Sequence, residues 1–498
     1  MKHIDGRVFA LSVGLLVLAT LPLALYPEGS GRIITVVYDW LALHLGPVYL
    51  WAGVATLGFS LVLAFGRHGP VVLGDDGESP EFSDGSWFAM LFCAGIASGL
   101  LYWGVIEWAY YFREPPYETS VGSAEAILWA TSYPLFHWGF TAWGFYTLPT
   151  VAVAYACHRR GETAYRLSKA CRPILGDRAD GAAGRLIDVL FMVGILGGAS
   201  TSLGLSTPLI AEGFSELTGA VRSFGLNVGI VLTCSLIFAI SVYVGLERGI
   251  RILSNVNLAL ALGLVAFVLV AGDTLFIAKM STAAAGHVIQ NFVRMNFWTD
   301  PILQTGFVES WTVFYWAWWI AYAPFVGLFV ARISRGRSIR QVILGMLILG
   351  TAGSWLFFMV LGNYALSLEL GGHVPVLAIL DERGAPAAIV AVILALPLGQ
   401  LALGVFCIVA LLYLATTFDS AAYTLAASAS RDLGPRGDPS RGHRSFWALA
   451  LAVLPIALLG IGGLRSLQMA SLVVSVPLLA VGCLLAISLR RALREDFG

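Results

Sequence analysis

Long apolar stretches recur along the chain, and they constrain its fold more than any other feature of the sequence. About 20 apolar residues are enough for one helix to cross a bilayer. Twelve such stretches occur in the 498 residues, near 8–26, 44–65, 86–112, 126–157, 186–210, 225–245, 254–278, 306–332, 339–363, 399–428, 444–463 and 467–489. The sequence therefore predicts an all-α integral membrane protein with twelve transmembrane helices.

The composition narrows the class of protein. Hydrophobic residues make up 58% of the chain and charged residues only 12%, about half the share of a soluble domain. The net charge is zero, which argues against a nucleic-acid partner. No HExxH-like pair suggests an enzyme, and no continuous polar lining suggests a channel. We expect a transporter, with a channel or a membrane-embedded enzyme as the alternatives from other classes.

Basic residues in the connecting segments predict the orientation, because Lys and Arg stay on the cytoplasmic side. The basic segments all follow even-numbered stretches, at 158–178, 247–251, 331–341, 431–444 and 490–495. This pattern predicts a multi-pass protein of the cell (plasma or inner) membrane with both termini in the cytoplasm.

Two shorter apolar segments fit no crossing. Residues 281–299 mix polar and apolar side chains and predict a helix along the membrane surface. Residues 386–397 are too short to span and end at Pro397, so we expect a re-entrant or surface helix.

The third stretch carries unusual groups for a membrane helix. Gly95 and Gly99 are compatible with a small-xxx-small packing face and with a locally unwound helix that binds a ligand through its backbone. Glu107 is a functional candidate because acidic residues in spans usually have a role. Since Glu107 lies beside Trp108 and Tyr110 near the predicted outer end, an interfacial structural role is equally compatible.

Aromatic side chains gather in the fourth and eighth stretches. Trp138, Trp143 and Tyr146 fall within an arc of roughly 140° on a helix, in the middle of the span rather than at an interfacial belt. In WTVFYWAWWIAYAPF (311–325), one helix face carries Tyr315, Trp318, Trp319, Tyr322 and Phe325. Ring faces attract cations and are the usual receptors of quaternary ammonium groups, so these residues are candidates for a substrate site. The alternative is that they form a stripe that packs in the core.

The tenth stretch contains a polar cluster made of Thr416, Thr417, Asp419 and Ser420. Its hydroxyl oxygens are ligands suited to a small hard cation. The alternative is that the threonines bond carbonyls of their own helix.

These motifs resemble those of the betaine/carnitine/choline transporter family. WTVFYWAWW and PFVGLFVARISRGRSIR (324–340) are similar to its signature segment, and FHWG, AWGFY, LYWG-x-IE and TTFDS extend the likeness over roughly 86–430. The resemblance implies a LeuT-like inverted 5+5 repeat preceded by two peripheral helices, and a homotrimer. The implied division is 1–85 (peripheral helices), 86–278 (first repeat), 279–305 (surface segment), 306–489 (second repeat) and 490–498 (cytoplasmic tail).

The resemblance also implies site residues. The aromatic cage for the substrate is expected from Trp138, Trp143, Tyr146, Trp318, Trp319 and Tyr322, with Trp316 and Phe325 along the path and Ala97 at the glycine run. A sodium site is expected from the hydroxyls of Thr416 and Thr417 and the carbonyls of Cys93, Ile96 and Tyr413. The likeness divides between two subgroups, because Tyr322 is typical of the carnitine exchangers, whereas 254–263 lacks the arginine that replaces sodium in them.

The expected function is secondary active transport of a betaine-type zwitterion bearing a quaternary ammonium group, coupled to sodium, by alternating access. We favour a zwitterion over choline because no acidic residue lies at the glycine run, where Ala97 is neutral, and because amides of a broken helix can receive a carboxylate. Cation-independent carnitine/betaine-type exchange is the alternative. We expect no cofactor other than sodium as the coupling ion.

Overall fold

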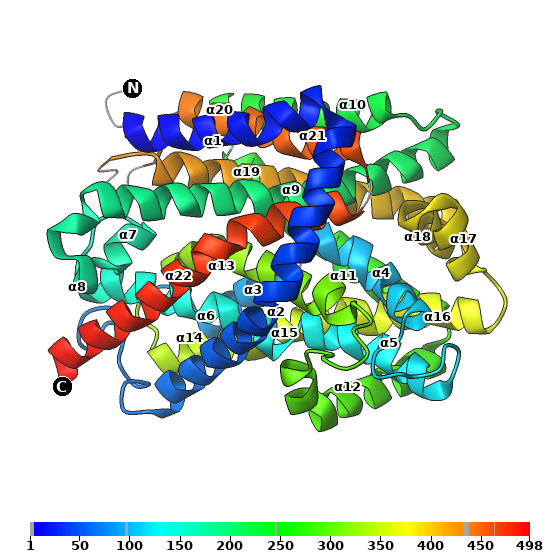
Figure 1. The fold of residues 1–498 in the computed structure, drawn as a ribbon, viewed down its shortest axis with the longest axis horizontal. Coiled ribbons are helices and arrows are strands. Elements are labelled where there is room, and N and C mark those ends of the chain that lie inside the picture. The colour runs from blue at the N-terminus through cyan, green and yellow to red at the C-terminus, as the bar shows by residue number, and fades with distance from the viewer. Residues whose placement is uncertain (1–3, 95–97, 245–246, 432–437, 463) are drawn as a thin grey trace.

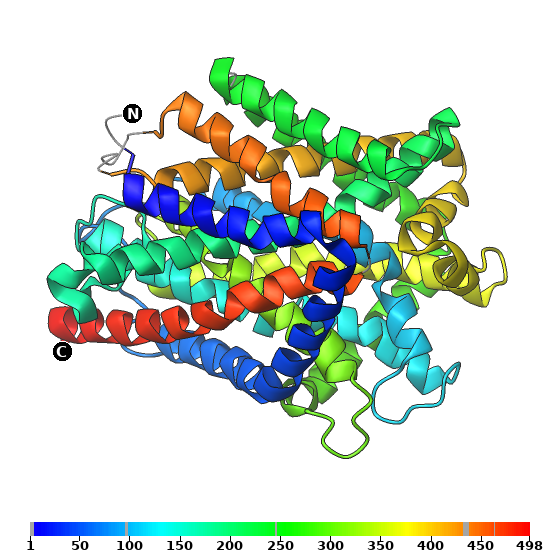
Figure 2. The ribbon, with the colours of Figure 1, turned by 45° about the horizontal axis from the view of Figure 1, so that its top comes forward.

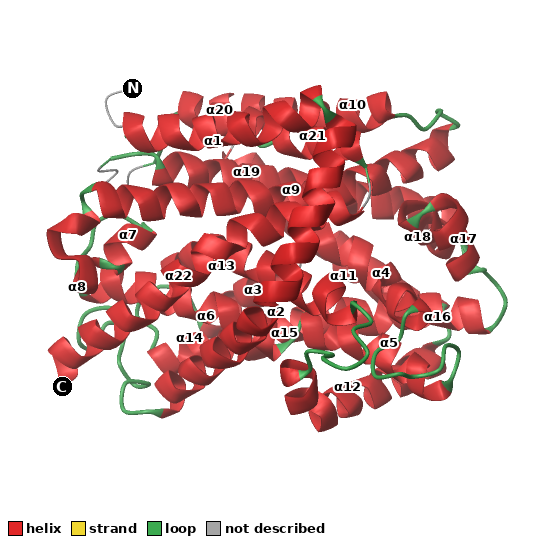
Figure 3. Ribbon diagram, viewed as in Figure 1, coloured by secondary structure: helices red, strands yellow, loops and turns green. Residues whose placement is uncertain are grey.

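The computed structural model describes residues 4–94, 98–244, 247–431, 438–462 and 464–498. Throughout these ranges the chain forms helices joined by loops, and isolated bridges are the only β pairing described there (Figure 3). The helices as far as the middle of the chain are α1 (Gly6–Leu25), α2 (Pro27–Phe65), α3 (Asp84–Ala94), α4 (Ser98–Arg113), α5 (Ala124–His137), α6 (Phe140–Ala154), η1 (Tyr155–Arg159), α7 (Leu167–Ala170), α8 (Arg172–Leu175), η2 (Gly176–Ala179), α9 (Ala182–Thr218), α10 (Phe224–Val244), α11 (Glu247–Ala271) and α12 (Thr274–Phe297).

The helices that follow include several π-helical turns, written η3 to η5, inside longer helical runs. They are η3 (Val308–Val313), α13 (Phe314–Ile333), α14 (Ile339–Gly345), η4 (Met346–Gly350), α15 (Thr351–Phe357), η5 (Phe358–Gly362), α16 (Asn363–Leu370), α17 (Val376–Arg383), α18 (Ala385–Leu394), α19 (Gly399–Ser428), α20 (Arg441–Ala450), α21 (Val453–Ile461) and α22 (Leu464–Phe497).

Helices long and apolar enough to cross a membrane confirm a multi-pass membrane protein. Within the described residues, eight helical runs meet this description by length and composition, and two bent pairs raise the number to ten if each is one crossing. The predicted stretches 126–157 and 225–245 correspond to the broken pair α5/α6 and to α10. Every predicted stretch is therefore mainly helical where described, with breaks that include 138–139 in 126–157 and 272–273 in 254–278. The count of twelve crossings and the inverted repeat remain predictions.

The first two helices lie at the edge of the bundle. Figure 1 shows α1 along one border and α2 crossing the outside of the molecule. Only 22% of the apolar window of α1 is buried, against 83% for α9 and 78% for the run Val308–Ile333. Figures 1 and 2 show the start of α1 and the end of α22 at the same end of the molecule.

The two short apolar segments differ in burial. The segment predicted at 281–299 lies within α12, which turns by 109° from the preceding helix. Its position relative to a membrane surface remains a prediction. The segment predicted at 386–397 forms α18, where seven of ten residues are buried, and it packs against α4, α9 and α19. α18 therefore packs closely against the bundle, and with α17 it lies at one end of the molecule (Figure 1), while its position relative to a membrane surface remains a prediction.

Candidate substrate and ion site

A break between α5 and α6 sets the geometry of the aromatic residues. The sequence around it contains Pro134 and Gly139, which favour a helix interruption. α5 ends at His137, and Trp138 occupies the break. The indole N–H of Trp355 donates to the carbonyl oxygen of Leu135 at 2.7 Å, and so satisfies a backbone group near the break. Trp138 is thus outside the regular helix that holds Trp143 and Tyr146, and the interpretation of one shared helix face is wrong.

The six side chains of the predicted cage nevertheless meet in space. The ring of Trp319 is the hub, with centroid distances of 4.6 Å to Tyr146, 5.8 Å to Trp143 and 5.5 Å to Trp138. Trp318 lies 5.7 Å from Trp138, and Tyr322 lies 6.3 Å from Trp318. Most pairs are edge-to-face, so each of these contacts sets the edge of one ring against the face of another.

Glycines allow neighbouring helices to approach the cage closely. A Cβ at Gly99, at the start of α4, would lie 3.1 Å from Trp318 and 3.6 Å from Trp138. A Cβ at Gly198 on α9 would lie 3.0 Å from Tyr322, and one at Gly350 in η4 would overlap the ring of Trp143. The cage is therefore closely surrounded by backbone from three other helical segments.

Hydrogen bonds fix two of the cage residues from α9. The indole N–H of Trp318 donates to the Gly198 carbonyl at 3.3 Å, and the hydroxyls of Tyr322 and Ser202 are 2.9 Å apart. The indole nitrogens of Trp143 and Trp319 are buried without a hydrogen-bond partner among the described residues. The indole nitrogens of Trp103, Trp129 and Trp316, outside the cage, are also unpaired there, so this feature alone does not distinguish the cage from packing tryptophans.

Glu107 belongs to this site, although its sequence neighbours left an interfacial role equally open. The side chain is fully buried. Its Oε2 accepts hydrogen bonds from Trp138 Nε1 at 3.1 Å and from the Tyr315 hydroxyl at 2.6 Å, and its Oε1 accepts one from the Tyr111 hydroxyl at 2.7 Å. Acidic character within a membrane span was the signal that pointed to it, and the adjacent aromatic residues obscured that signal.

Trp316 and Phe325 occupy different surroundings. Trp316 packs against Phe136 at 5.3 Å and Phe145 at 5.7 Å, on another side of α13 from the cage. Phe325 lies 5.9 Å from Tyr322 and lines a large cavity. The structure thus brings Phe325 to the site and does not bring Trp316 to it.

This cavity of about 720 Å³ reaches the cage through Phe325, which contacts Tyr322, and none of the six cage rings is among its lining residues. Its lining comes from α3, α11, α13 and α19, together with residues 163–166 and the end of α19 near Ser428 and Ser430. The last two regions adjoin segments predicted to be cytoplasmic, so the cavity opens toward the predicted cytoplasmic side.

Aromatic packing closes the opposite side of the cage. Trp103 and Tyr110 of α4 contact Trp311 at 6.0 and 5.1 Å, and Trp103 lies 6.3 Å from Phe314. We call these four residues the aromatic plug. The start of α4 lies against Trp318, since a Cβ at Gly99 would contact that ring, whereas Tyr110 near the end of α4 contacts Trp311. The plug therefore lies between Trp103 and the end of α4 and just before and at the start of α13, and the cavity is lined by the later part of α13.

The predicted ion-binding threonines line the cavity. Thr416 and Thr417 both donate their hydroxyls to the carbonyl of Tyr413, at 3.1 and 2.8 Å, as the intrahelical alternative expected. Their oxygens keep lone pairs for a further partner. Asn257 Oδ1 and the Tyr413 hydroxyl are buried and without a hydrogen-bond partner in the described part of the chain, and both residues line the same cavity.

These oxygens fit a hard monovalent cation better than a transition metal. Hydroxyl, amide and carbonyl oxygens are hard ligands. No group of three or more His, Cys, Asp or Glu side chains suited to a metal occurs within the described residues. Cys93 lines the cavity, whereas Ile96 and Ala97 lie outside the described residues, so their expected roles stay predictions. The flanking helices of the glycine run, 84–94 and 99–113, are bent by 54°.

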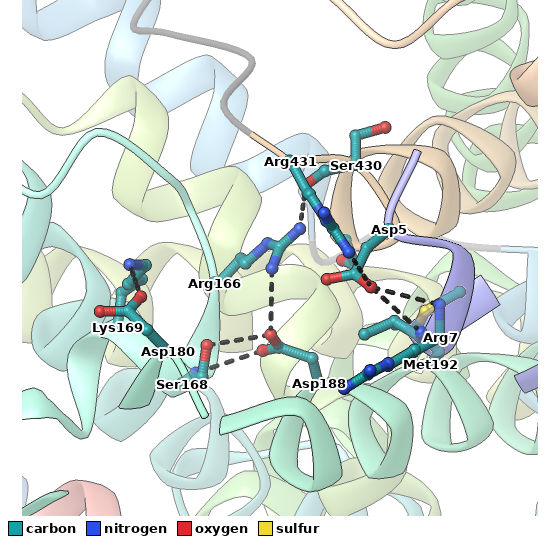
Figure 4. A network of polar contacts seen from close by, with 12 residues as sticks. Asp5, Arg7, Arg166, Ser168, Lys169, Asp180, Asp188, Met192, Ser430 and Arg431 are labelled. Carbon is teal, nitrogen blue, oxygen red and sulfur yellow. Dashed lines mark hydrogen bonds and ion pairs between the residues drawn. The ribbon is translucent and has the colours of Figure 1, made fainter. Parts of the chain in front are cut away.

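A polar network surrounds one side of the cavity entrance (Figure 4). Arg166, which lines the cavity, pairs with Asp188 at 3.5 Å and donates to the backbone carbonyl of Ser430. Nearby, the hydrogen bond from Lys169 holds the pKa of the Asp180 carboxyl below its usual range. The segment after α6 is thereby tied to α9 and to the end of α19.

Comparison with known proteins adds independent information. Residues 7–498 match the family model described as "BCCT, betaine/carnitine/choline family transporter". The chain is 36% identical over 442 residues to the Uncharacterized transporter YeaV of Escherichia coli K12, covering 89% of this chain and 92% of that protein. It is 35% identical over 480 residues to the Carnitine transporter of Acinetobacter baumannii ATCC 19606, covering 95% of this chain and 86% of that protein.

Proposed function

The chain belongs to the betaine/carnitine/choline transporter family, and from this membership we propose that it is a secondary active transporter of a betaine-type zwitterion bearing a quaternary ammonium group. The observation that carries the proposal is the convergence of six aromatic rings from α6, α13 and the break between α5 and α6, connected through Phe325 to a cavity. A quaternary ammonium group has no N–H to donate, so ring faces recognise it better than polar side chains do.

A difference between the two sides of the cage supports alternating access: one side adjoins a cavity and the other is closed by aromatic side chains. The cavity reaches Phe325 on one side, whereas the aromatic plug closes the other. This arrangement supports an inward-open state, from which the substrate leaves toward the cytoplasm. In the outward-open state the plug would separate and the cavity near Phe325 would close.

We propose sodium as the co-transported ion, bound by Thr416 and Thr417 together with carbonyl oxygens. The cluster of hard oxygens on the cavity surface supports this coupling. Cation-independent exchange is the second candidate, because Tyr322 is shared with the carnitine exchangers that the sequence resembles and because one relative is named a carnitine transporter.

One uptake experiment tests the substrate and the coupling together. The purified protein in proteoliposomes would be given radiolabelled glycine betaine, carnitine or choline, with an inward sodium gradient or with potassium instead. Sodium-dependent uptake into empty vesicles supports symport. Uptake that needs preloaded substrate and ignores sodium supports exchange, and no uptake of any quaternary ammonium compound contradicts the proposed function.

The remaining expectations concern assembly and orientation. We propose a homotrimer in the cell membrane with both termini cytoplasmic. The orientation is supported by the start of α1 and the end of α22, which lie at the same end of the molecule. The exposed apolar faces of the peripheral helices support contact with lipid or with other subunits. Native mass spectrometry of the detergent-solubilised protein tests the trimer, and protease access to terminal tags in oriented vesicles tests the orientation.

A further inference from the structure

The carboxylate of Glu107 has no formal role in the proposed transport cycle, although it contacts the cage directly. It receives three hydrogen bonds from Trp138, Tyr315 and Tyr111, which belong to or adjoin α5, α13 and α4. Burying an ionised carboxyl in a membrane protein is costly, so without a counter-charge the group takes up a proton instead. The question is therefore which group can balance the ionised form of Glu107.

Neighbouring protein groups do not supply that balance. Within the described residues, no Lys or Arg forms an ion pair with Glu107, and His137 is the nearest ionisable nitrogen, at 3.6 Å. The Tyr111 hydroxyl donates to Glu107 and can accept from His137 Nδ1 at 2.9 Å, while His137 Nε2 can accept from Thr312 at 3.0 Å. One ring proton is enough to satisfy both nitrogens, so this network does not require a charged imidazole.

The carboxylate lies directly behind two aromatic residues of the substrate site. Trp138 binds Glu107 through its indole N–H, while its ring contacts Trp318 and Trp319. Tyr315 binds the same carboxylate oxygen, and its ring lies 5.8 Å from Trp138 and 6.2 Å from Trp318. Donation to an anion shifts electron density toward the donor ring, which makes the ring face a better cation receptor.

We infer that Glu107 is the buried counter-charge of the bound ammonium group, acting through Trp138 and Tyr315, and that it makes a positive head group a requirement for binding. This inference rests on the proposed function. It also supplies the acidic group whose absence from the glycine run argued against choline. A purely cationic substrate is therefore acceptable to this side of the site, and discrimination against it depends on the carboxylate end.

The test compares charge with shape. Glycine betaine and 3,3-dimethylbutanoate have the same outline, but the second carries a neutral tert-butyl group in place of trimethylammonium. Binding would be followed by tryptophan fluorescence in wild type, Glu107→Gln and Glu107→Asp, with melting temperatures for each. Gln keeps the size and the acceptor oxygen, whereas Asp keeps the charge.

We expect Glu107→Gln to weaken betaine binding about tenfold, as the loss of one charge across a single indole in a dry site implies. Binding of 3,3-dimethylbutanoate should not weaken, and Glu107→Asp should bind betaine better than Glu107→Gln does. The opposite order of the two variants, or unchanged betaine affinity in Glu107→Gln, overturns the inference, because the carboxylate would then only position the rings.

A matched control separates this outcome from a general disturbance of the network. Tyr111→Phe removes one of the three hydrogen bonds to Glu107 but keeps the carboxyl group, so betaine affinity should fall by less than in Glu107→Gln. A loss as large as that of Glu107→Gln would contradict the inference. Wild-type protein that neither binds nor transports betaine, carnitine or choline would instead contradict the proposed function, before any variant is compared.

Discussion

At the scale of single residues, neighbouring tryptophans of α13 have separate tasks. Trp319 contacts three other cage residues, whereas Trp316 contacts Phe136 and Phe145 on another side of the helix. The sequence pattern predicted the face that Trp319 shares with Trp318 and Tyr322. The pattern gives no reason to exclude Trp316 from the substrate path. That residue is assigned to the path only because it matches a position of the resembled family.

The first prediction uses this pair as variant and control. Trp319→Leu removes a ring face worth roughly 1–2 kcal/mol in a dry site, so betaine binding should weaken about five- to thirtyfold. Trp319→Phe should lose less because a smaller ring remains. Fluorescence titration and melting curves are the measurements. Trp316→Leu should show the reverse profile, with affinity retained and the melting temperature lowered; equal profiles for the two positions would contradict the assignment.

A second prediction concerns the candidate ion ligands. Replacing both Thr416 and Thr417 by Ala removes two hydroxyl oxygens from the cavity. The sodium concentration for half-maximal uptake in proteoliposomes should therefore rise. Thr424→Ala is the control, since Thr424 lines the same cavity on the same helix but lies about two helical turns beyond Thr417. An unchanged sodium dependence in the double variant would exclude these hydroxyls as ligands.

At the scale of helices, the cage depends on a break between α5 and α6, whereas a periodicity analysis assumes that a helix is continuous. Periodicity alone predicts one continuous helix through FHWGF (136–140) and places Trp138 on the same face as Trp143 and Tyr146. Pro134 and Gly139 break that helix, and the carbonyl of Leu135 is satisfied by Trp355 from a distant segment. Such a partner cannot be found from local sequence, because it depends on how α15 packs against α5.

Close packing behind Trp143 gives the third prediction. A Cβ at Gly350 would overlap the Trp143 ring, so Gly350→Ala forces either the ring or η4 to move. Overpacking of this kind costs about 1–3 kcal/mol. We expect a lower melting temperature and weaker betaine binding. Gly404→Ala, where a Cβ meets nothing within 4 Å, should change neither property; a neutral Gly350→Ala would mean that Trp143 has room to shift.

At the scale of the whole molecule, hydropathy predicted the multi-pass organisation, whereas the orientation predicted from loop charge stays a prediction. Apolar length is a physical requirement for crossing a bilayer, so it leaves a strong signal in sequence. Burial of a helix against other helices leaves a weaker signal in the sequence. Residues 386–397 are apolar enough for lipid or for protein, and their place as α18 against other helices depends on tertiary packing. Glu107 was ambiguous for the same reason.

The open cavity gives the fourth prediction. Cys93 lines it and is partly exposed, whereas Cys171 is buried. With Cys93 as the only cysteine, a membrane-impermeant thiol reagent should label it from the cytoplasmic side of oriented vesicles. A variant retaining only Cys171 should remain unlabelled until it is denatured. Labelling of Cys93 only from the opposite side would contradict the inward-open assignment.

The aromatic plug has a consequence for how the transport rate depends on temperature. Separating Trp103, Tyr110, Trp311 and Phe314 would bring large apolar surfaces into contact with water, and hydration of apolar surface raises heat capacity. The outward-open state should then have the higher heat capacity. A plot of the logarithm of the initial uptake rate against inverse temperature should be curved, and Trp311→Ala, which removes much of that surface, should straighten it.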